Sequence, residues 1–505
     1  MVLTGADVAS HNSKDSLWMI IHGRVYDLTE FAPSHPGGMK ILLKYAGKDA
    51  TEEYDPIHPP GTIEEALSPD KHLGEVDMST LEDGQKIVEE AVPPPQASSS
   101  SSSAPPSTPE PPLTLGACLN LHDIEKAAER LLKPKAWAYY RSAADDEKTF
   151  DWNQASFSTV RLRPRVLRDV TSVDLSTNIL GFKSSMPVFI SPAAMGRLAH
   201  PEGEKCLARV AAAHEIPYMI SANASVGFED IAAQAQNGQT LFYQLYVNQD
   251  RAKSEDILKR VKKAGYKAIC VTVDAPVAGK RERDERSKLD DESAADPSMQ
   301  KAVEKSGPDT PDAPQDPAAQ SIASTLGSYV DPALTWDDLQ WVKQASDGLP
   351  LMVKGVQTAN DAALAAHYGV NAIILSNHGG RQLEGAPSSL ETLLEIRKFE
   401  PQVLKKLEVY CDGGFRRGTD ILKAIALGAT AVGVGRPFMY SLAFGDQGVD
   451  KVATILRDEL AQNTRLLGAT KIDEVVPAMV NTRMLERDLY DGPYNSPIQR
   501  LLAKL

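Results

Sequence analysis

Residues 372–383 read Ala-Ile-Ile-Leu-Ser-Asn-His-Gly-Gly-Arg-Gln-Leu. Four apolar residues come first, and His378 and Arg381 follow them at a spacing of three. A short continuous apolar run bounded by turn residues is typical of a strand buried on both faces, as in a parallel sheet. Polar residues at the end of such a strand are typical of the catalytic edge of an α/β protein. The segment therefore predicts a buried strand that carries functional side chains at its carboxyl end.

Seven more short apolar runs flank this strand and are separated by stretches with helical periodicity. They span residues 187–192, 218–223, 241–247, 268–274, 351–355, 408–413 and 431–436. Eight buried strands that alternate with helices predict an α/β fold, a (β/α)8 or TIM barrel, whose chemistry lies at the carboxyl ends of the strands. Polar residues lie at the carboxyl end of five of the runs, namely Asp274, Lys354, Asn377 with His378, Asp412 and Arg436.

The pair His378 and Arg381 suits a 2-hydroxy acid. An arginine can hold a carboxylate through two parallel hydrogen bonds, and a histidine tuned near neutrality can take a proton from the adjacent carbon or hydroxyl. Asp274 is the candidate partner of His378, because a carboxylate on the far ring nitrogen stabilises the imidazolium. A helix-capping histidine, an arginine in a surface salt bridge and an N-cap aspartate are the alternatives.

Glycine-rich segments follow the last two strands, at residues 412–420 (Asp-Gly-Gly-Phe-Arg-Arg-Gly-Thr-Asp) and 433–437 (Gly-Val-Gly-Arg-Pro). Loops after these strands commonly form the phosphate site of a TIM barrel, since glycines let backbone N–H groups approach closely. A phosphate-bearing cofactor is therefore predicted. Lys354, which ends an apolar strand, would place a cation beside a flavin ring, with a surface lysine as the alternative.

Two histidines, His35 and His58, stand 23 residues apart in the N-terminal region, the first within His-Pro-Gly-Gly. Two neutral imidazoles can fill both axial positions of a haem iron, and such a site transfers electrons because no position remains for oxygen. Gly37 and Gly38 allow a sharp turn before a helix that begins near Met39. On spacing alone, two surface loop histidines are the favoured alternative.

The first 80 or so residues resemble the cytochrome b5 family, whose hallmark is His-Pro-Gly-Gly followed by a second ligand histidine about two dozen residues later. The match covers nearly the whole segment. The resemblance implies a small α+β domain in which His35 and His58 bind haem b. The proline-flanked second histidine is more similar to the haem domain of flavocytochrome b2 than to microsomal cytochrome b5.

From about Leu115 onward, the segments quoted above resemble the FMN-dependent 2-hydroxy acid dehydrogenase and oxidase family, which includes glycolate oxidase and flavocytochrome b2. The resemblance implies that His378 is the catalytic base and Asp274 its partner. Substrate-binding residues would be Arg381 and Arg281 for the carboxylate, with hydrogen bonds from Tyr139 and the catalytic Tyr246. FMN contacts would come from Ser221, Gln244, Thr272, Lys354, Asp412, Gly414, Arg416, Gly435 and Arg436.

Two positions depart from the family pattern. Asn223 stands where the lactate and glycolate enzymes have a large apolar residue that shapes the pocket, so the substrate side chain is left open. A polar group there would accept a larger or more polar hydroxy acid. Ala193 replaces a threonine that is usual near the flavin, and this alters little if the backbone makes the contact.

Composition divides the chain into modules. A Pro- and Ser-rich segment, with six serines at residues 98–103, predicts a flexible linker. The predicted layout is a cytochrome b5-like domain at 1–82, the linker at 83–114 and the barrel at 115–505. A charged segment at 284–324 with few apolar residues is interpreted as a mobile loop insertion, or as an insertion without a role.

The order of haem domain, linker and barrel resembles flavocytochrome b2. It implies FMN-dependent oxidation of an L-2-hydroxy acid, lactate-like, to the 2-oxo acid. Electrons would pass from FMN to haem and on to cytochrome c or a similar one-electron acceptor. The alternatives are an oxidase that uses oxygen with an uncoupled haem domain, a flavin-dependent isomerase, and a non-catalytic haem carrier.

The net charge of −14 disfavours nucleic-acid binding and suits a basic partner. The four cysteines form no CxxC pair, and no apolar run is long enough for a membrane span, so a soluble intracellular protein is predicted. No presequence is visible, and the final Ala-Lys-Leu resembles a peroxisomal address, which leaves cytosol and peroxisome as candidates. Family resemblance suggests the mitochondrial intermembrane space as the alternative, and a homotetramer.

Overall fold

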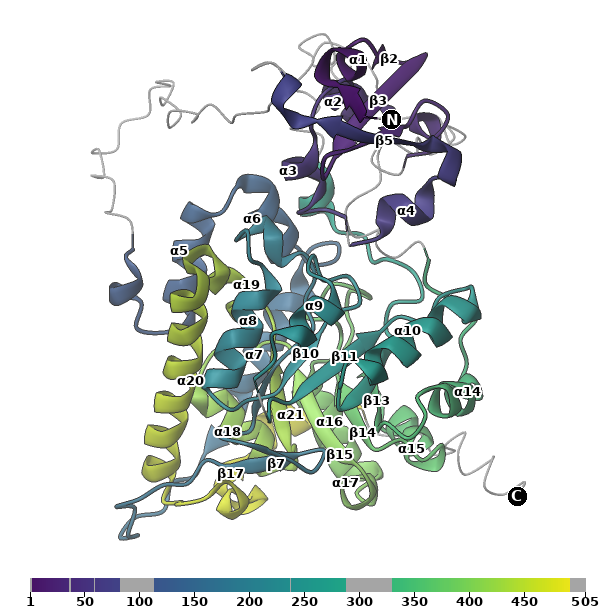
Figure 1. Cartoon of the computed structure of the whole chain (residues 1–505). Coiled ribbons are helices and arrows are strands. Elements are labelled where there is room, and N and C mark those ends of the chain that lie inside the picture. Colours follow the sequence, from purple (N-terminus) through teal and green to yellow (C-terminus); the bar gives the residue numbers. More distant parts are fainter. Residues whose placement is uncertain are drawn as a thin grey trace, which may run out of the picture. The chain divides into compact units, whose positions relative to one another are not determined.

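The computed structural model of the chain describes residues 2–35, 38–58, 60–81, 113–236, 238–287 and 329–490. The chain passes from one compact unit to a second between Thr114 and Leu115 (Figure 1). Most of the predicted linker, most of the predicted loop insertion and the C-terminal tripeptide lie outside the described residues.

The first unit is built on a five-stranded sheet in the order β1-β5-β4-β3-β2. Strand β1 pairs parallel to β5, and the other neighbours pair antiparallel. The strands are β1 (Val2–Thr4), β2 (Asn12–Ser13), β3 (Ser16–Ile21), β4 (Arg24–Asp27) and β5 (His72–Asp77). The helices are α1 (Gly5–Ala9), α2 (Met39–Tyr45), α3 (Thr51–Tyr54) and α4 (Thr62–Ala66).

Strand β3 supplies side chains to two cores, one on each face of this sheet. Leu17, Met19 and Ile21 pack into a buried cluster with residues of α2 and α4. Trp18 and Ile20 belong to a second cluster that includes α1. Successive side chains of a strand point to opposite faces of the sheet, so a strand that is covered on both faces contributes alternate residues to two cores. The predicted α+β domain is confirmed.

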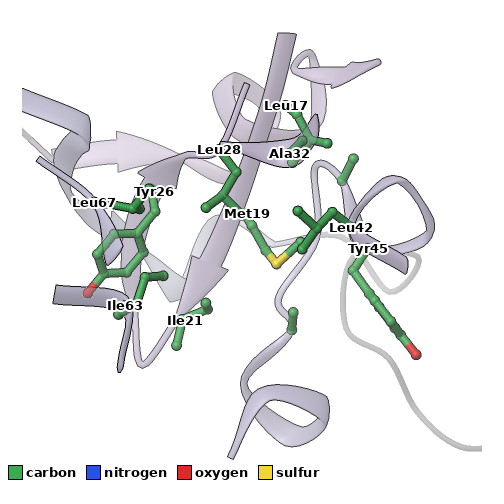
Figure 2. Close-up of a cluster of buried hydrophobic side chains, with 12 residues drawn as sticks. Leu17, Met19, Ile21, Tyr26, Leu28, Ala32, Leu42, Tyr45, Ile63 and Leu67 are labelled. Atoms are coloured by element: carbon green, nitrogen blue, oxygen red, sulfur yellow. The ribbon is translucent and has the colours of Figure 1, made fainter. Parts of the chain in front are cut away.

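Replacing Met19 tests the first of these cores. Figure 2 shows its side chain pointing toward Leu42 of α2, and it is only 3% exposed. We expect Met19→Ala to lower the free energy of unfolding of this unit by roughly 2–5 kcal/mol, because it leaves a cavity. The measurement is urea unfolding of the haem-loaded full chain, followed by the haem absorbance band. Val2→Ala, at a 66% exposed position, is the control and should change the midpoint little; an unchanged midpoint for Met19→Ala would contradict the prediction.

The second unit contains a closed barrel of eight parallel strands, in the order β9 to β16. Seven of the eight predicted runs contain one of them, and β13 extends one residue beyond the eighth run, so the predicted TIM barrel is confirmed. The strands are β9 (Val188–Ile190), β10 (Tyr218–Ile220), β11 (Leu241–Leu245), β12 (Ala268–Thr272), β13 (Leu351–Val356), β14 (Ala372–Leu375), β15 (Glu408–Asp412) and β16 (Ala431–Val434).

The barrel interior is filled toward the amino ends of the strands. Phe189, Phe242, Met352 and Tyr410 belong to one buried cluster there. The hairpin of β7 (Thr177–Ile179) and β8 (Phe182–Ser184) packs against it. Leu180 lies in the turn of this hairpin, and its backbone N–H donates to the carboxylate of Glu408, the first residue of β15, at 3.0 Å. Since the hairpin closes the amino end, only the carboxyl end is left for a site.

Helices surround the strands (Figure 1). The larger ones that follow strands are α8 (Glu204–Ala213), α9 (Phe228–Ala233), α10 (Arg251–Lys263), α14 (Asp338–Ala345), α15 (Ala359–His367), α16 (Ser389–Phe399), α18 (Gly418–Leu427) and α20 (Gly445–Leu467). The others include α5 (Leu121–Leu131), α6 (Pro134–Arg141), α7 (Lys148–Thr159), α17 (Val403–Lys406), α19 (Arg436–Ser441) and α21 (Arg483–Arg487). None of the helices in the described ranges is long and apolar enough to cross a membrane.

Candidate active site

The carboxyl ends of all eight barrel strands contribute to one pocket. In the order of the strands, the residues that line it include Ser191, Ser221, Gln244, Thr272, Lys354, His378, Asp412 and Gly435. The remaining predicted substrate and flavin contacts line it too, namely Tyr139, Asn223, Tyr246, Arg281, Arg381, Gly414, Arg416 and Arg436. Asp274 lies directly behind His378. The structure thus brings together every residue that the sequence predicts for the barrel site.

His378 is held by a carboxylate on one nitrogen and faces a phenol with the other. Its Nδ1 lies 2.8 Å from Oδ1 of Asp274, whose side chain is completely buried. Its Nε2 lies 3.5 Å from the hydroxyl of Tyr246. Because a carboxylate can only accept, Nδ1 carries the proton, and Nε2 is the atom available as a base.

The charge states of this pair follow from burial and neighbouring charges. Burial lowers the pKa of the His378 imidazole below its ordinary value of 6.5, and Lys354 adds to this effect. The Asp274 carboxylate opposes the shift without overcoming it. Burial alone would raise the pKa of Asp274, but His378 and Lys354 lower it. A neutral imidazole therefore stands against an ionised carboxylate at pH 7.

Lys354 lies between two carboxylates beneath the pocket. Its Nζ is 3.5 Å from Oδ2 of Asp412 and 3.8 Å from Oδ2 of Asp274, and it donates to the Ser376 hydroxyl at 2.9 Å. Burial alone would lower the pKa of this amine, but the two carboxylates raise it above the usual lysine value. Lys354 is therefore a fixed positive charge, although only 4% of the residue is exposed.

Two arginines enter the pocket without forming an ion pair in the described part of the chain. Arg281 is 7% exposed, and its side chain makes no hydrogen bond to the described residues, although the charge of Asp284 acts on it. Arg381 donates to the backbone carbonyls of Tyr139 and Tyr140, and it forms no ion pair within the described ranges. Burial and the charge of Arg381 lower the pKa of Arg281. A buried cation in this state favours an anionic ligand, and a carboxylate matches its geometry.

The turn that carries His378 has an unusual backbone. His378, Gly379 and Gly380 have φ values of 60°, 64° and 78°, all in the left-handed region. A Cβ on Gly380 would lie 2.6 Å from the backbone nitrogen of Phe150, so only glycine lets α7 approach this closely. Arg436 fixes the same turn by donating to the carbonyl of Gly379 at 2.8 Å. Strain of this kind persists only where the surrounding structure holds it, commonly at active sites.

Buried polar atoms without partners gather around the rest of the pocket. Among the described residues, no hydrogen bond is made by Nε2 of Gln244, Oγ1 of Thr272, Oδ1 of Asp412, Nε of Arg416 or Oγ of Ser191. Buried polar groups are normally paired, and each unpaired one costs about 1–3 kcal/mol. Their convergence fits a polar ring ligand, and the glycines and arginines after β15 and β16 fit its phosphate.

Ser191 and Asn153 are examples of pocket residues that were not predicted from the sequence. Ser191 directly follows β9 and lies in the predicted run 187–192. Its position at the carboxyl end of a predicted strand could therefore have identified it as a site residue. Asn153 of α7 exchanges two 2.9 Å hydrogen bonds with the side chain of Asn377. No local pattern marks it, because its partner is 224 residues away.

In the first unit, His35 and His58 face each other. Their ring centroids are 6.1 Å apart, with an angle of 36° between the planes. Nδ1 of His58 lies 3.1 Å from the carbonyl of Tyr54, and Nδ1 of His35 lies 3.4 Å from that of Gly38. Two imidazoles that bind one metal at about 2 Å through the other nitrogen have ring centres roughly 6 Å apart. A carbonyl on Nδ1 is the usual way to orient such a ligand, so the pair fits a haem iron.

The surroundings of these histidines also fit a haem. Phe31, Met39 and Leu43 are partly buried apolar residues packed against the first core, and the Phe31 ring lies 5.8 Å from that of His35. The Tyr54 ring stacks on His58 with centroids 4.3 Å apart and planes 9° apart. An apolar, aromatic environment is what a porphyrin ring requires.

The comparison with known families decides the assignment. A family model described as FMN-dependent dehydrogenase matches residues 128–482. The chain belongs to this family. A second model, described as cytochrome b5-like heme/steroid binding domain, matches residues 4–77. The predicted FMN and haem cofactors, and the predicted FMN-dependent dehydrogenase, are confirmed; the roles of individual residues stay predictions.

Relatives of this FMN-dependent dehydrogenase share both parts of the chain. This chain is 41% identical over 486 residues to an L-lactate dehydrogenase (cytochrome) of Wickerhamomyces anomalus, and the match covers 96% of this chain and 80% of that one. It is 39% identical over 511 residues to the protein of the same name from Saccharomyces cerevisiae, covering 97% and 83%. The solved flavin-binding domain of baker's yeast flavocytochrome b2 is 39% identical, with a TM-score of 0.65, over 77% of this chain and 92% of that one.

Gly414, in the loop after β15, tests the predicted flavin site. Gly414 has a φ of +82°, and a Cβ there would lie 2.0 Å from the carbonyl oxygen of Asn153. We expect Gly414→Ala to weaken FMN binding at least tenfold, because the loop must move away from α7. FMN content and flavin fluorescence during dilution measure this. Gly385→Ala is the matched control, with a φ of +86° and no atom within 4 Å, and it should keep its FMN. Full FMN retention in Gly414→Ala would contradict the expectation.

Proposed function

We propose that the barrel oxidises an L-2-hydroxy acid to the 2-oxo acid and that lactate is the reference substrate. The observation that carries the proposal is the placement of a neutral, carboxylate-oriented His378 in one pocket with two arginines that form no ion pair with the described residues. The arginines match the acid group, and the histidine matches the carbinol beside it. The names of the relatives support L-lactate as the substrate.

In the proposed reaction, Arg281 and Arg381 hold the substrate carboxylate. Nε2 of His378 accepts a proton from the carbinol group, and Asp274 stabilises the imidazolium that results. Tyr246 donates a hydrogen bond to the substrate oxygen, since its hydroxyl already lies next to Nε2. The substrate loses one hydrogen as the proton taken by His378, and its second hydrogen and two electrons would go to bound FMN, which leaves the 2-oxo acid.

We propose that the flavin ring is held by Ser221, Gln244, Thr272 and Lys354, and the ribityl phosphate by Asp412, Gly414, Arg416, Gly435 and Arg436. Lys354 is charged and buried, so it would stabilise negative charge on a reduced ring. Tyr139 would complete the substrate site from α6. It is 4% exposed, and the guanidinium of Arg381 lies 5.4 Å from the centre of its ring.

For the first unit we propose an electron-transfer role. His35 and His58 would bind the haem iron on both sides, and a bis-histidine haem carries one electron at a time. A cytochrome c-like acceptor is proposed from the relatives' names, and the net charge of −14 suits a basic partner. The layout proposed is a haem domain at 1–82, a linker at 83–114 and a flavin domain at 115–505. A homotetramer and an intracellular location stay predictions.

The pKa of His378 sets the expected pH dependence. A base must be neutral to act, so kcat/KM for the hydroxy acid should fall about tenfold per pH unit on the acid side. Because the pKa of His378 is lowered, this fall should begin below pH 6.5. Asp274→Asn removes the group that raises this pKa, so the acid limb should move to still lower pH while the maximal rate drops. Anaerobic flavin bleaching, followed from about pH 4.5 to about pH 8, measures the position of the acid limb and the maximal rate. An acid limb above pH 6.5 would rule out this assignment of the base.

The haem route can be tested by removing one ligand. We expect His58→Ala to leave flavin bleaching by L-lactate within about twofold and to reduce cytochrome c reduction at least tenfold, because haem binding needs both imidazoles. Anaerobic stopped-flow spectroscopy of the full chain follows the flavin and haem bands separately. His22→Ala is the control, since His22 is a half-exposed histidine of the same unit. Undiminished cytochrome c reduction would contradict the haem route, and oxygen consumption by the unaltered chain in air would favour an oxidase with an uncoupled haem domain.

A further inference from the structure

A polar pair is built into the wall of the substrate pocket. Asn223, which follows β10, is 8% exposed, and the hydroxyl of Tyr329 donates to its Oδ1 at 2.9 Å. This bond leaves the Nδ2 amide as the group that Asn223 can present. Among the described residues, Nδ2 has no hydrogen-bond partner, and Asn223 lines the pocket. Nδ2 is not one of the fully buried atoms, so it is open to the pocket and can donate a hydrogen bond to a ligand there.

The backbone holds Tyr329 in this place. The N–H of Gln249 donates to the carbonyl of Tyr329 at 3.1 Å, and the N–H of Asp331 donates to the carbonyl of Val247 at 2.9 Å. Asp331 also forms an ion pair with Arg251 at 2.7 Å. These contacts tie residues 329–331 to the loop after β11, which carries Tyr246. The pair is therefore a fixed part of the catalytic edge.

The polar pair stands in an apolar part of the wall. Ala193 and Ala194, at the end of the neighbouring strand β9, line the same pocket, as does Val330. The alanines are small, so they leave room for a substituent larger than a methyl group. The carboxylate of a substrate is already matched by the two arginines. The Nδ2 group of Asn223 is thus available to the substrate side chain.

We infer that the Asn223–Tyr329 pair selects 2-hydroxy acids whose side chain carries a hydrogen-bonding oxygen, of which a hydroxyl on C3 is the simplest. The inference rests on the proposed function, whose substrate class it narrows. An apolar side chain would bury the Nδ2 amide without a partner, whereas an oxygen would accept its hydrogen bond. Tyr329 is a positioning residue, because its hydroxyl fixes the orientation of the amide.

Two matched acids test this. L-glycerate and L-2-hydroxybutyrate are similar in size and differ in that a hydroxyl of the first is a methyl group in the second. With the FMN-loaded full chain, anaerobic flavin bleaching should give a kcat/KM for L-glycerate about tenfold above that for L-2-hydroxybutyrate, the effect of one net hydrogen bond. In Asn223→Leu this ratio should fall at least tenfold. In Tyr329→Phe this ratio should fall by a smaller factor, because the Asn223 amide is still present and has lost only the hydrogen bond that orients it.

Val330→Ala is the control, since it changes the same wall without changing a hydrogen bond, and its ratio should stay near that of the unaltered chain. The inference is overturned if the unaltered chain has a kcat/KM for L-2-hydroxybutyrate equal to or above that for L-glycerate. An unchanged ratio of the two values in an Asn223→Leu protein that retains FMN overturns it as well. Rapid bleaching by L-lactate in the same series would show that the proposed function nevertheless holds. Failure of all three acids to bleach a fully FMN-loaded chain would overturn the proposed function and the inference together.

Discussion

The pocket depends on a row of alternating buried charges beneath it. Asp412, Lys354 and Asp274 lie side by side, and His378 completes the row through a 2.8 Å hydrogen bond. Each charge is tolerated in the interior because its neighbour has the opposite sign. The two carboxylates keep the lysine charged, whereas burial, helped by Lys354 and opposed by Asp274, keeps the imidazole neutral. The acid–base properties of the site are thus a consequence of the order in which four strand ends meet.

Above this row, the balance of charge reverses. Arg281 and Arg381 form no ion pair in the described part of the chain, and Arg436 donates its hydrogen bonds there to backbone carbonyls. A site with surplus buried positive charge is costly until an anionic ligand enters. A carboxylate and a phosphate are two anions that such a site would favour. Ligand binding and stability of this edge are therefore coupled.

Much of the barrel could be predicted from the sequence, because its strands are buried on both faces. A strand in that environment must be continuously apolar, so eight short runs marked eight strands. The polar residues that end those runs could be assigned to one edge, because parallel strands share a carboxyl end. His35 and His58 are a weaker case: their spacing alone favours two loop histidines, and the resemblance of the whole segment was needed to predict that they bind haem.

The sequence by itself determined which side chains lie at the edge of the barrel, since periodicity is a local property. Only the tertiary structure decided their mutual geometry: Asp274 and His378 are 104 residues apart in the chain and 2.8 Å apart in space. Asn153 and Tyr329 illustrate the limit, because each gains its place from a partner more than 100 residues away. Such pairs are set by barrel closure and by helix packing over its end, which leave no periodic pattern in the chain.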